Sequence, residues 1–232
     1  MALSLRLPPS KPETSQCENA HKVLVATHTT CDSFFKSFEQ IRRDRSATGA
    51  STDLEQDLLR AMLVFASSGL DALIKQLVND ALPELLARGE RDSGPTARFR
   101  DFVREKIERD EKLAARLIAE NVTAASPQSS TIQWYIRELT SNSLQSKDQV
   151  LQIASFFDIK SNVLTDDFDG LKKLFDARNE IIHEMDINFT ATNRNRNQRT
   201  KKFAVESTNH LFAIAEKFLS EVDNLCSSIS QA

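Results

Sequence analysis

Three residues whose side chains could act together in catalysis occur within one short stretch: Arg178, Asn179 and His183. The run from Asp167 to Asp186 has the apolar spacing of a helix, in which successive residues are rotated by about 100°. Its apolar residues then form one stripe: Leu171, Leu174, Phe175, Ile181, Ile182 and Met185. Arg178 lies at the centre of that stripe, and Asn179 and His183, four residues apart, share one of its flanks. A cation that faces a core must be paired or must serve a polar site, because a lone buried charge is too costly.

An imidazole, a guanidinium and an amide on one helix fit a reaction at a phosphate ester that needs no metal. Imidazole titrates near neutral pH and can therefore act as acid or base. Guanidinium binds two phosphate oxygens at once and stabilises negative charge that grows in a transition state. The amide can orient the imidazole or donate to a phosphoryl oxygen. This set suits attack of an RNA 2′-OH on the adjacent phosphate, which leaves a 2′,3′-cyclic phosphate and a 5′-OH; DNA lacks the attacking hydroxyl.

A structural role is the alternative for the same residues. Asp71 lies inside an apolar run of the chain, and it is either a surface residue or the carboxylate that pairs with Arg178. In the second case the two residues form a buried ion pair between helices, and His183 is a half-buried histidine with satisfied hydrogen bonds. Three acidic residues also lie near His183 in the sequence and would favour its protonated form if they face it. They are Glu180, Glu184 and Asp186.

The arrangement of Arg178, Asn179 and His183 resembles the motif of the HEPN superfamily, whose members carry Arg, four to six further residues and then His, usually with a polar residue directly after the Arg. Within that superfamily the lead-in from Phe168 to Phe175 and the run from Gln149 to Ile159 look most like the RiboL-PSP-HEPN branch. The resemblance covers roughly residues 52 to 227, although its specific part is six residues long. One departure is Glu184, which stands where branch members often have Gly, and it concerns the end of the helix more than the chemistry.

The resemblance implies a metal-independent endoribonuclease without a cofactor, with Arg178, Asn179 and His183 as catalytic residues and RNA as substrate. It also implies that an acidic residue on an early helix faces the motif, for which Asp71 is the candidate. Related proteins act in toxin–antitoxin and phage-defence systems and dimerise so that two motif helices meet across a cleft. A homodimer and an antitoxin or other defence-system partner are therefore expected. Other members are non-catalytic, so a scaffold or accessory subunit is the alternative, and a helical interaction protein of unrelated ancestry is the third.

A strongly basic segment follows the motif helix. Between Asn193 and Lys202 there are five cations and no acid: Arg194, Arg196, Arg199, Lys201 and Lys202. Such a segment can contact RNA phosphates and bases beside the catalytic helix. The alternative is a solvated, mobile loop. A second cationic run, Arg42-Arg43-Asp44-Arg45, suits the end of a helix, where cations favour the helix dipole, and it is the other candidate path for RNA.

Composition predicts an all-α, soluble, cytoplasmic protein. The 232 residues are 40% hydrophobic and 27% charged, with few Gly and Pro, and the net charge of −3 gives no general attraction to nucleic acid. Cys17, Cys31 and Cys226 lack the spacing of metal ligands and fit free thiols in a reducing compartment. No signal peptide is indicated, and no stretch approaches the roughly 20 apolar residues that span a bilayer.

The expected organisation is a flexible N-terminal arm, residues 1–18, followed by one HEPN-like helical domain, residues 19–232. Its outer helices, 19–88 and 167–229, form a bundle, and the middle section, 92–165, is a helical insertion. Thr52 to Glu55 fits a capping box, Gly69 indicates a close approach between helices, and Pro83 should kink or end a helix. Trp134 and Tyr135 are either core residues or a stacking platform for bases.

Overall fold

The computed structural model describes residues 3–46, 49–88 and 94–230. Every regular element in these ranges is a helix, and the only β-type pairing that they contain is an isolated bridge between Ile187 and Arg196. The predicted all-α class is confirmed. Residues around Gly89, where a helix stop was expected, lie outside the described ranges; the helix before them ends at Arg88.

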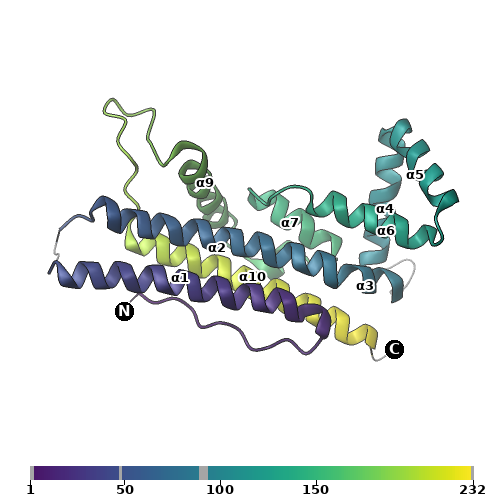
Figure 1. Cartoon of the computed structure of the whole chain (residues 1–232), viewed down its shortest axis with the longest axis horizontal. Helices are drawn as coiled ribbons and strands as arrows, with labels where there is room; N and C mark the ends of the chain where they lie inside the picture. The colour runs from purple at the N-terminus through teal and green to yellow at the C-terminus, as the bar shows by residue number, and fades with distance from the viewer. Residues whose placement is uncertain (1–2, 47–48, 89–93, 231–232) are drawn as a thin grey trace.

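Three long helices form the bundle: α1 (Glu18–Asp44), α2 (Asp53–Asp80) and α10 (Lys201–Ser230). They run side by side, and α2 packs against both of the others (Figure 1). The predicted capping box at the start of α2 is present: the Thr52 N–H donates to Glu55 Oε2 (2.9 Å), and the Glu55 N–H donates to Thr52 Oγ1 (3.4 Å). A Cβ atom on Gly69 would lie 2.2 Å from the Thr27 side chain, which confirms the close approach of α1 and α2.

The cations at the end of α1 are used inside the bundle. Arg42 and Arg45 both form ion pairs with Glu55, at 3.2 and 3.0 Å, and Glu55 is fully buried. Glu55 therefore has two roles, because the same carboxylate that completes the capping box also joins the end of α1 to the start of α2. Arg43, in contrast, is exposed and donates to Gln40 (2.8 Å).

Only Ala81 separates α2 from α3 (Leu82–Arg88), two residues before Pro83, so the two helices nearly continue one another. The middle section then consists of shorter helices: α4 (Gly94–Arg109), α5 (Glu111–Thr123), α6 (Pro127–Thr140), α7 (Lys147–Phe156) and α8 (Ser161–Leu164). Figure 1 shows α4, α5 and α6 beside the α3 end of the bundle. Trp134 and Tyr135 are buried in α6, and Tyr135 packs on Phe102 with ring centroids 4.9 Å apart, so both are core residues.

The N-terminal arm lies along the bundle rather than free in solvent, as Figure 1 shows. The Arg6 N–H donates to Asn209 Oδ1 (2.8 Å), and Asn209 Nδ2 donates to the Ser4 carbonyl (2.9 Å). Leu3 and Leu5 pack against the core. The arm ends in a short 3-10 helix, η1 (Ser15–Cys17), directly before α1.

One helical run among the described residues, Asp53–Arg88, is long and apolar enough to cross a membrane. This finding differs from the expectation that no such stretch exists. More than half of its apolar window (56%) is buried inside the bundle, and a core helix of a soluble protein passes the same test. The run is therefore weak evidence for a membrane span.

Candidate functional site

The candidate motif lies on α9 (Phe168–Glu184), which packs against α2, α7 and α10. Asp167 caps the helix by accepting from the Gly170 N–H (2.8 Å), and a Cβ atom at residue 170 would clash with this carboxylate. The helix ends after Glu184, because Met185 and Asp186 both adopt left-handed backbone conformations (φ 52° and 60°). The helix is therefore two residues shorter at its C-terminus than the apolar spacing predicts, and His183 lies in its last turn.

Arg178 is buried, with 9% of its surface exposed, although it carries a charge. Its Nη1 donates to Asn179 Oδ1 (2.9 Å), and its Nε is buried without a hydrogen-bond partner among the described residues. The Asn179 Nδ2 donates to the Gln145 carbonyl (3.0 Å), in the loop between α6 and α7. Burial lowers the pKa of Arg178, and the charge of Asp71 partly offsets this effect. The guanidinium is thus held by an amide rather than by a carboxylate.

Asp71 does not form the ion pair with Arg178 that the sequence allows. Its Oδ2 accepts from Lys75 Nζ (3.1 Å), one turn further along α2, and its Oδ1 accepts from the Leu144 N–H (3.0 Å). Both carboxylate oxygens are therefore occupied by other donors. Asp71 still lies close enough to Arg178 to act on its pKa, so a supporting electrostatic role stays a prediction.

The apolar stripe of α9 changes character along the helix. Leu171 and Leu174 are buried, whereas Ile182 is 39% exposed and Met185 is 63% exposed. Phe189, just after the helix, is also largely exposed. His183 lies on the surface in the last turn of the same helix, and no hydrogen bond or ion pair within the described part of the chain holds its imidazole. A free imidazole beside an uncovered apolar surface suits a site that a second molecule completes.

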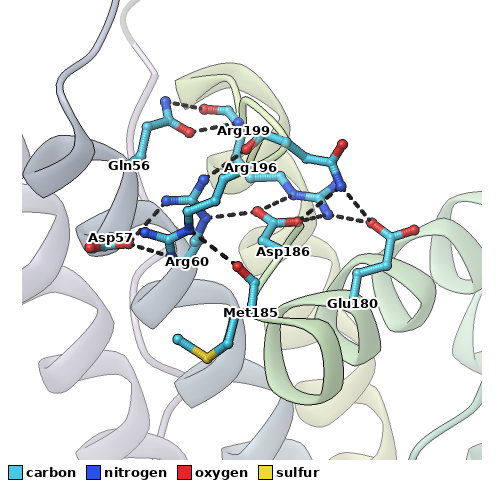
Figure 2. A network of polar contacts seen from close by, with 9 residues as sticks. Gln56, Asp57, Arg60, Glu180, Met185, Asp186, Arg196 and Arg199 are labelled. Carbon is cyan, nitrogen blue, oxygen red and sulfur yellow. Dashed lines mark hydrogen bonds and ion pairs between the residues drawn. The ribbon is translucent and has the colours of Figure 1, made fainter. Parts of the chain in front are cut away.

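The segment after α9 is fixed to α2 by a network of buried charges (Figure 2). Asp186 is fully buried and accepts from Arg60 Nε (2.7 Å) and from Arg199 Nη2 (2.5 Å). Arg199 Nη2 also pairs with Glu180 of α9 (2.6 Å), and its backbone exchanges two hydrogen bonds with the Gln56 side chain (2.7 and 3.0 Å). The network therefore connects the motif helix, the loop and α2.

Two more contacts complete this network. Arg60 Nη2 donates to the Asn197 carbonyl (2.7 Å), and Arg196 pairs with Asp57 (2.8 Å). The Arg196 Nε also donates to the Met185 carbonyl, where α9 ends (3.2 Å). These contacts fix the backbone directly after His183.

The two charges at the centre of this network stabilise each other. Burial alone would raise the pKa of Asp186, but the hydrogen bonds from Arg199 and Arg60 outweigh it and hold this pKa below its ordinary value. Burial would likewise lower the pKa of Arg199, and its bonds to Asp186 and Glu180 raise it instead. Both groups are therefore ionised in the folded protein at neutral pH. Because Glu180 and Asp186 point to Arg199, two of the three acids near His183 in sequence are used elsewhere.

The five cations predicted to bind RNA fall into two groups. Arg196 and Arg199 belong to the network, and Lys201 pairs with a carboxylate of α1 at 2.7 Å. Arg194 is exposed and makes no ion pair with any residue that the structure describes, and Lys202 is exposed with one distant partner, at 3.9 Å. Among the described residues of this segment, Arg194 is therefore the cation that RNA can reach without breaking an internal ion pair, and Lys202 would give up only a distant, exposed one.

Sequence reasoning missed Arg60 and Gln56. Both are buried positions on α2, next to the apolar residues Leu59 and Met62. A cation in the middle of a buried helical run was the available signal, and it is the same signal that singled out Arg178. Their partners, however, lie 126 and 143 residues away, where no local pattern shows them.

No protein-family model, curated protein or solved structure matches the chain. Among the residues that the structure describes, no group of three or more His, Cys, Asp or Glu side chains is placed to hold a metal ion. The resemblance to HEPN proteins therefore depends on the motif and its lead-in alone. A functional proposal for this chain has to be argued from the positions and contacts of Arg178, Asn179 and His183.

Proposed function

We propose that this protein is a HEPN-type endoribonuclease that cleaves RNA without a metal and acts as a homodimer. The observation that carries the proposal is Arg178: a buried guanidinium that has no carboxylate partner among the described residues and is held by Asn179. His183, with a free imidazole, lies five residues further along the same helix. A buried charge that only stabilised the fold would be expected to have a carboxylate partner. An unpaired one is better explained by an anion that arrives from outside.

In the proposed reaction each side chain has a separate task. His183 takes the proton from the RNA 2′-OH or gives one to the leaving 5′ oxygen, since an imidazole does both near neutral pH. Arg178 stabilises the charge on the phosphoryl oxygens in the transition state. Asn179 fixes the guanidinium through its Oδ1, and its own Nδ2 is fixed by the Gln145 carbonyl. Asp71 contributes negative charge that partly offsets the lowering of the Arg178 pKa by burial.

One copy of the chain supplies only one imidazole and one guanidinium, which is a sparse site for both acid and base catalysis. A cavity of about 530 Å³ between α4, α6 and α7 is lined by Leu144 and Gln149 but not by the three motif residues. At and just after the end of the motif helix, Ile182, Met185 and Phe189 expose apolar surface. A second α9 placed against this surface would bring two motifs together and form the cleft. A role as a cytoplasmic toxin or phage-defence effector, restrained by an antitoxin or another defence-system protein, follows from the same proposal.

The test is incubation of purified protein with mixed RNAs in EDTA, followed by analysis of the product ends. We expect 2′,3′-cyclic phosphate and 5′-OH ends, no cleavage of DNA of the same sequence, and loss of most activity in His183→Ala. Glu184→Ala is the matched control, because it changes the neighbouring exposed position of the same helical turn and should remain active. Cleavage that chelation abolishes, or that is unchanged in His183→Ala, would contradict the proposal.

A non-catalytic scaffold is the second candidate, and the basic segment favours it. Four of its five cations form ion pairs within the chain, and three of these pairs are 2.8 Å or shorter, as expected if the segment is a structural clamp rather than a path for RNA. The scaffold predicts no cleavage at any protein concentration. Toxicity on expression that depends on His183 would argue against it.

A further inference from the structure

Two of the three cysteines, Cys17 and Cys226, come from opposite ends of the sequence and meet at one end of the bundle. Cys17 is the last residue of η1, Cys226 lies near the end of α10, and the two are buried with 0% and 5% of their surface exposed. In Figure 1 the start of α1 and the C-terminal end of α10 lie at the same end of the molecule, and η1 contacts α10. The spacing of cysteines in the sequence does not reveal this pair.

Hydrogen bonds one turn away hold the two cysteines in place. The Thr14 N–H and hydroxyl both donate to Asp223 Oδ1, at 2.9 and 2.5 Å. Thr14 accepts the Cys17 N–H through its carbonyl (3.2 Å), and Asp223 precedes Cys226 by three residues on α10. Within this clamp the Cys17 and Cys226 thiols are close enough for each to shift the pKa of the other.

We propose that Cys17 and Cys226 are a redox-active pair, which a two-electron oxidant such as a peroxide converts into an intramolecular disulfide. The sulfur of Cys226 attacks the peroxide, the O–O bond breaks, and Cys226 becomes a sulfenic acid while an alcohol or water leaves. The sulfur of Cys17 then attacks the Cys226 sulfur, the S–S bond forms, and the hydroxyl group leaves as water with the Cys17 proton. In total the two sulfurs lose two electrons and the peroxide gains them.

The environment of the pair determines which sulfur reacts first. The neighbouring Cys17 lowers the pKa of Cys226, whereas Cys226 and burial raise the pKa of Cys17. Cys226 is thus the more acidic thiol of the pair, and we assign to it the attack on the peroxide, because the thiolate is the nucleophile. The extended arm beside the pair has no helix before Ser15, so local opening of the arm admits the oxidant without unfolding the bundle.

Oxidation would join the two ends of the chain. The new bond links the start of α1 to the last turns of α10 and closes a loop that contains most of the protein. Disulfides that close long loops restrict the unfolded chain strongly. The oxidised protein should therefore unfold at a temperature several degrees higher than the reduced protein.

The experiment treats the folded full-length chain with tert-butyl hydroperoxide and then alkylates the remaining thiols in denaturant. We expect one alkylated thiol of three, a mass loss of two hydrogen atoms, and a peptide that joins Cys17 to Cys226. Cys31→Ser is the matched control. Cys31 is an equally buried thiol, but it faces the Met62 carbonyl (3.6 Å) rather than another sulfur. This variant should lose both of its remaining thiols. Cys226→Ser should retain both of its thiols, because the sulfur that attacks the peroxide is gone. Cys17→Ser should form no disulfide and should stop at the Cys226 sulfenic acid, which is seen as a gain of one oxygen atom.

The wild-type measurement decides the matter even if a serine variant fails to fold. Three thiols left after treatment of the folded protein would overturn the proposal, and so would a disulfide that includes Cys31. A disulfide between two chains, recognised because dilution suppresses it, would also overturn it. Reduction with dithiothreitol should restore three thiols and the lower unfolding temperature.

Discussion

Arg178 is an unusual residue for the core of a small helical protein, because its charge is buried and its Nε has no partner among the described residues. Arg60 provides a comparison within the same chain, since it is buried to a similar extent but is held by Asp186, by Asp57 and by a backbone carbonyl. The structure thus contains one buried arginine with a full set of partners and one with a free donor. The first stabilises the fold, and we assign the second to the proposed phosphate site.

This difference leads to a prediction for Arg178→Met. The change removes a poorly compensated buried charge and keeps most of the side-chain volume. The free energy of unfolding should therefore fall by no more than about 1 kcal/mol, and it can also rise. RNA cleavage should fall by about 100- to 1000-fold, the usual loss when one donor to a transition-state anion is removed. Denaturant unfolding and initial cleavage rates measure the two effects.

Arg60→Met is the matched control. It leaves the buried Asp186 with one arginine instead of two and should destabilise the protein by about 3–5 kcal/mol. If Arg178→Met destabilises the fold as much as Arg60→Met does, Arg178 is a structural residue and the scaffold is favoured.

The residues of the motif could be identified from the sequence, but their partners could not. The predicted helix is present as α9, so helix geometry fixes how Arg178, Asn179 and His183 follow one another along it, and their joint role in catalysis stays a prediction. Asp71 shows the limit of such reasoning. Its carboxylate accepts from the Leu144 N–H, 73 residues away, and this contact depends on how a loop crosses α2.

At the scale of elements, the end of α9 is determined by the residues that follow it. Met185 and Asp186 are in the left-handed conformation, which costs about 1 kcal/mol or more for residues other than Gly. The ion pairs of Asp186 with Arg60 and Arg199 compensate for this cost. The network therefore sets the position at which the motif helix ends and with it the place of His183.

Asp186→Asn tests this role through its pH dependence. The pKa of Asp186 is lowered in the folded protein from its ordinary value of 3.8, so its charge contributes stability above about pH 4 and loses that contribution as the pH falls. At pH 7 the variant should be less stable by about 3–5 kcal/mol, since it removes the fully buried carboxylate that Arg60 and Arg199 share and leaves them only the partly exposed Asp57 and Glu180. The difference from wild type should shrink below pH 4.

Asp57→Asn is the control for this experiment. Asp57 also pairs with Arg60 and Arg196, but its side chain is about half exposed, so its loss should cost roughly 1 kcal/mol or less. Equal losses for Asp57→Asn and Asp186→Asn, or a difference from wild type that is constant between pH 3 and pH 7, would show that the buried charge does not hold the loop.

The helices were largely predictable and the N-terminal arm was not, for one physical reason. Apolar periodicity and caps such as Thr52 act within a few residues, so α1, α2, α9 and α10 were located from the sequence to within a few residues. The arm has no such periodicity and appears loose from its composition. It is held by Asn209 and Asp223, more than 200 residues away, which accept backbone N–H groups of the arm.

At the scale of the whole molecule, two exposed apolar regions differ in what surrounds them. Ile182 and Met185 lie beside His183 at the end of α9, whereas Ile118 and Val122 lie one turn apart on α5, in the middle section. Both regions would gain from a partner. Only a contact at α9 would bring a second guanidinium and imidazole to the motif, so we assign the dimer to the α9 region.

The last prediction compares these two regions directly. The double variant Ile182→Glu, Met185→Glu places four like charges at a symmetric contact and should weaken dimerisation by about 100-fold or more, as expected for the loss of central apolar contacts. Cleavage at low protein concentration should fall in parallel and should recover as the concentration rises.

The control Ile118→Glu, Val122→Glu adds the same charge to more exposed side chains, 61% and 81%, so any general repulsion of RNA is matched. Sedimentation equilibrium and cleavage rates over a range of protein concentrations measure both effects. A wild-type monomer with full activity, or a control variant that loses the dimer while the α9 variant keeps it, would refute the assignment.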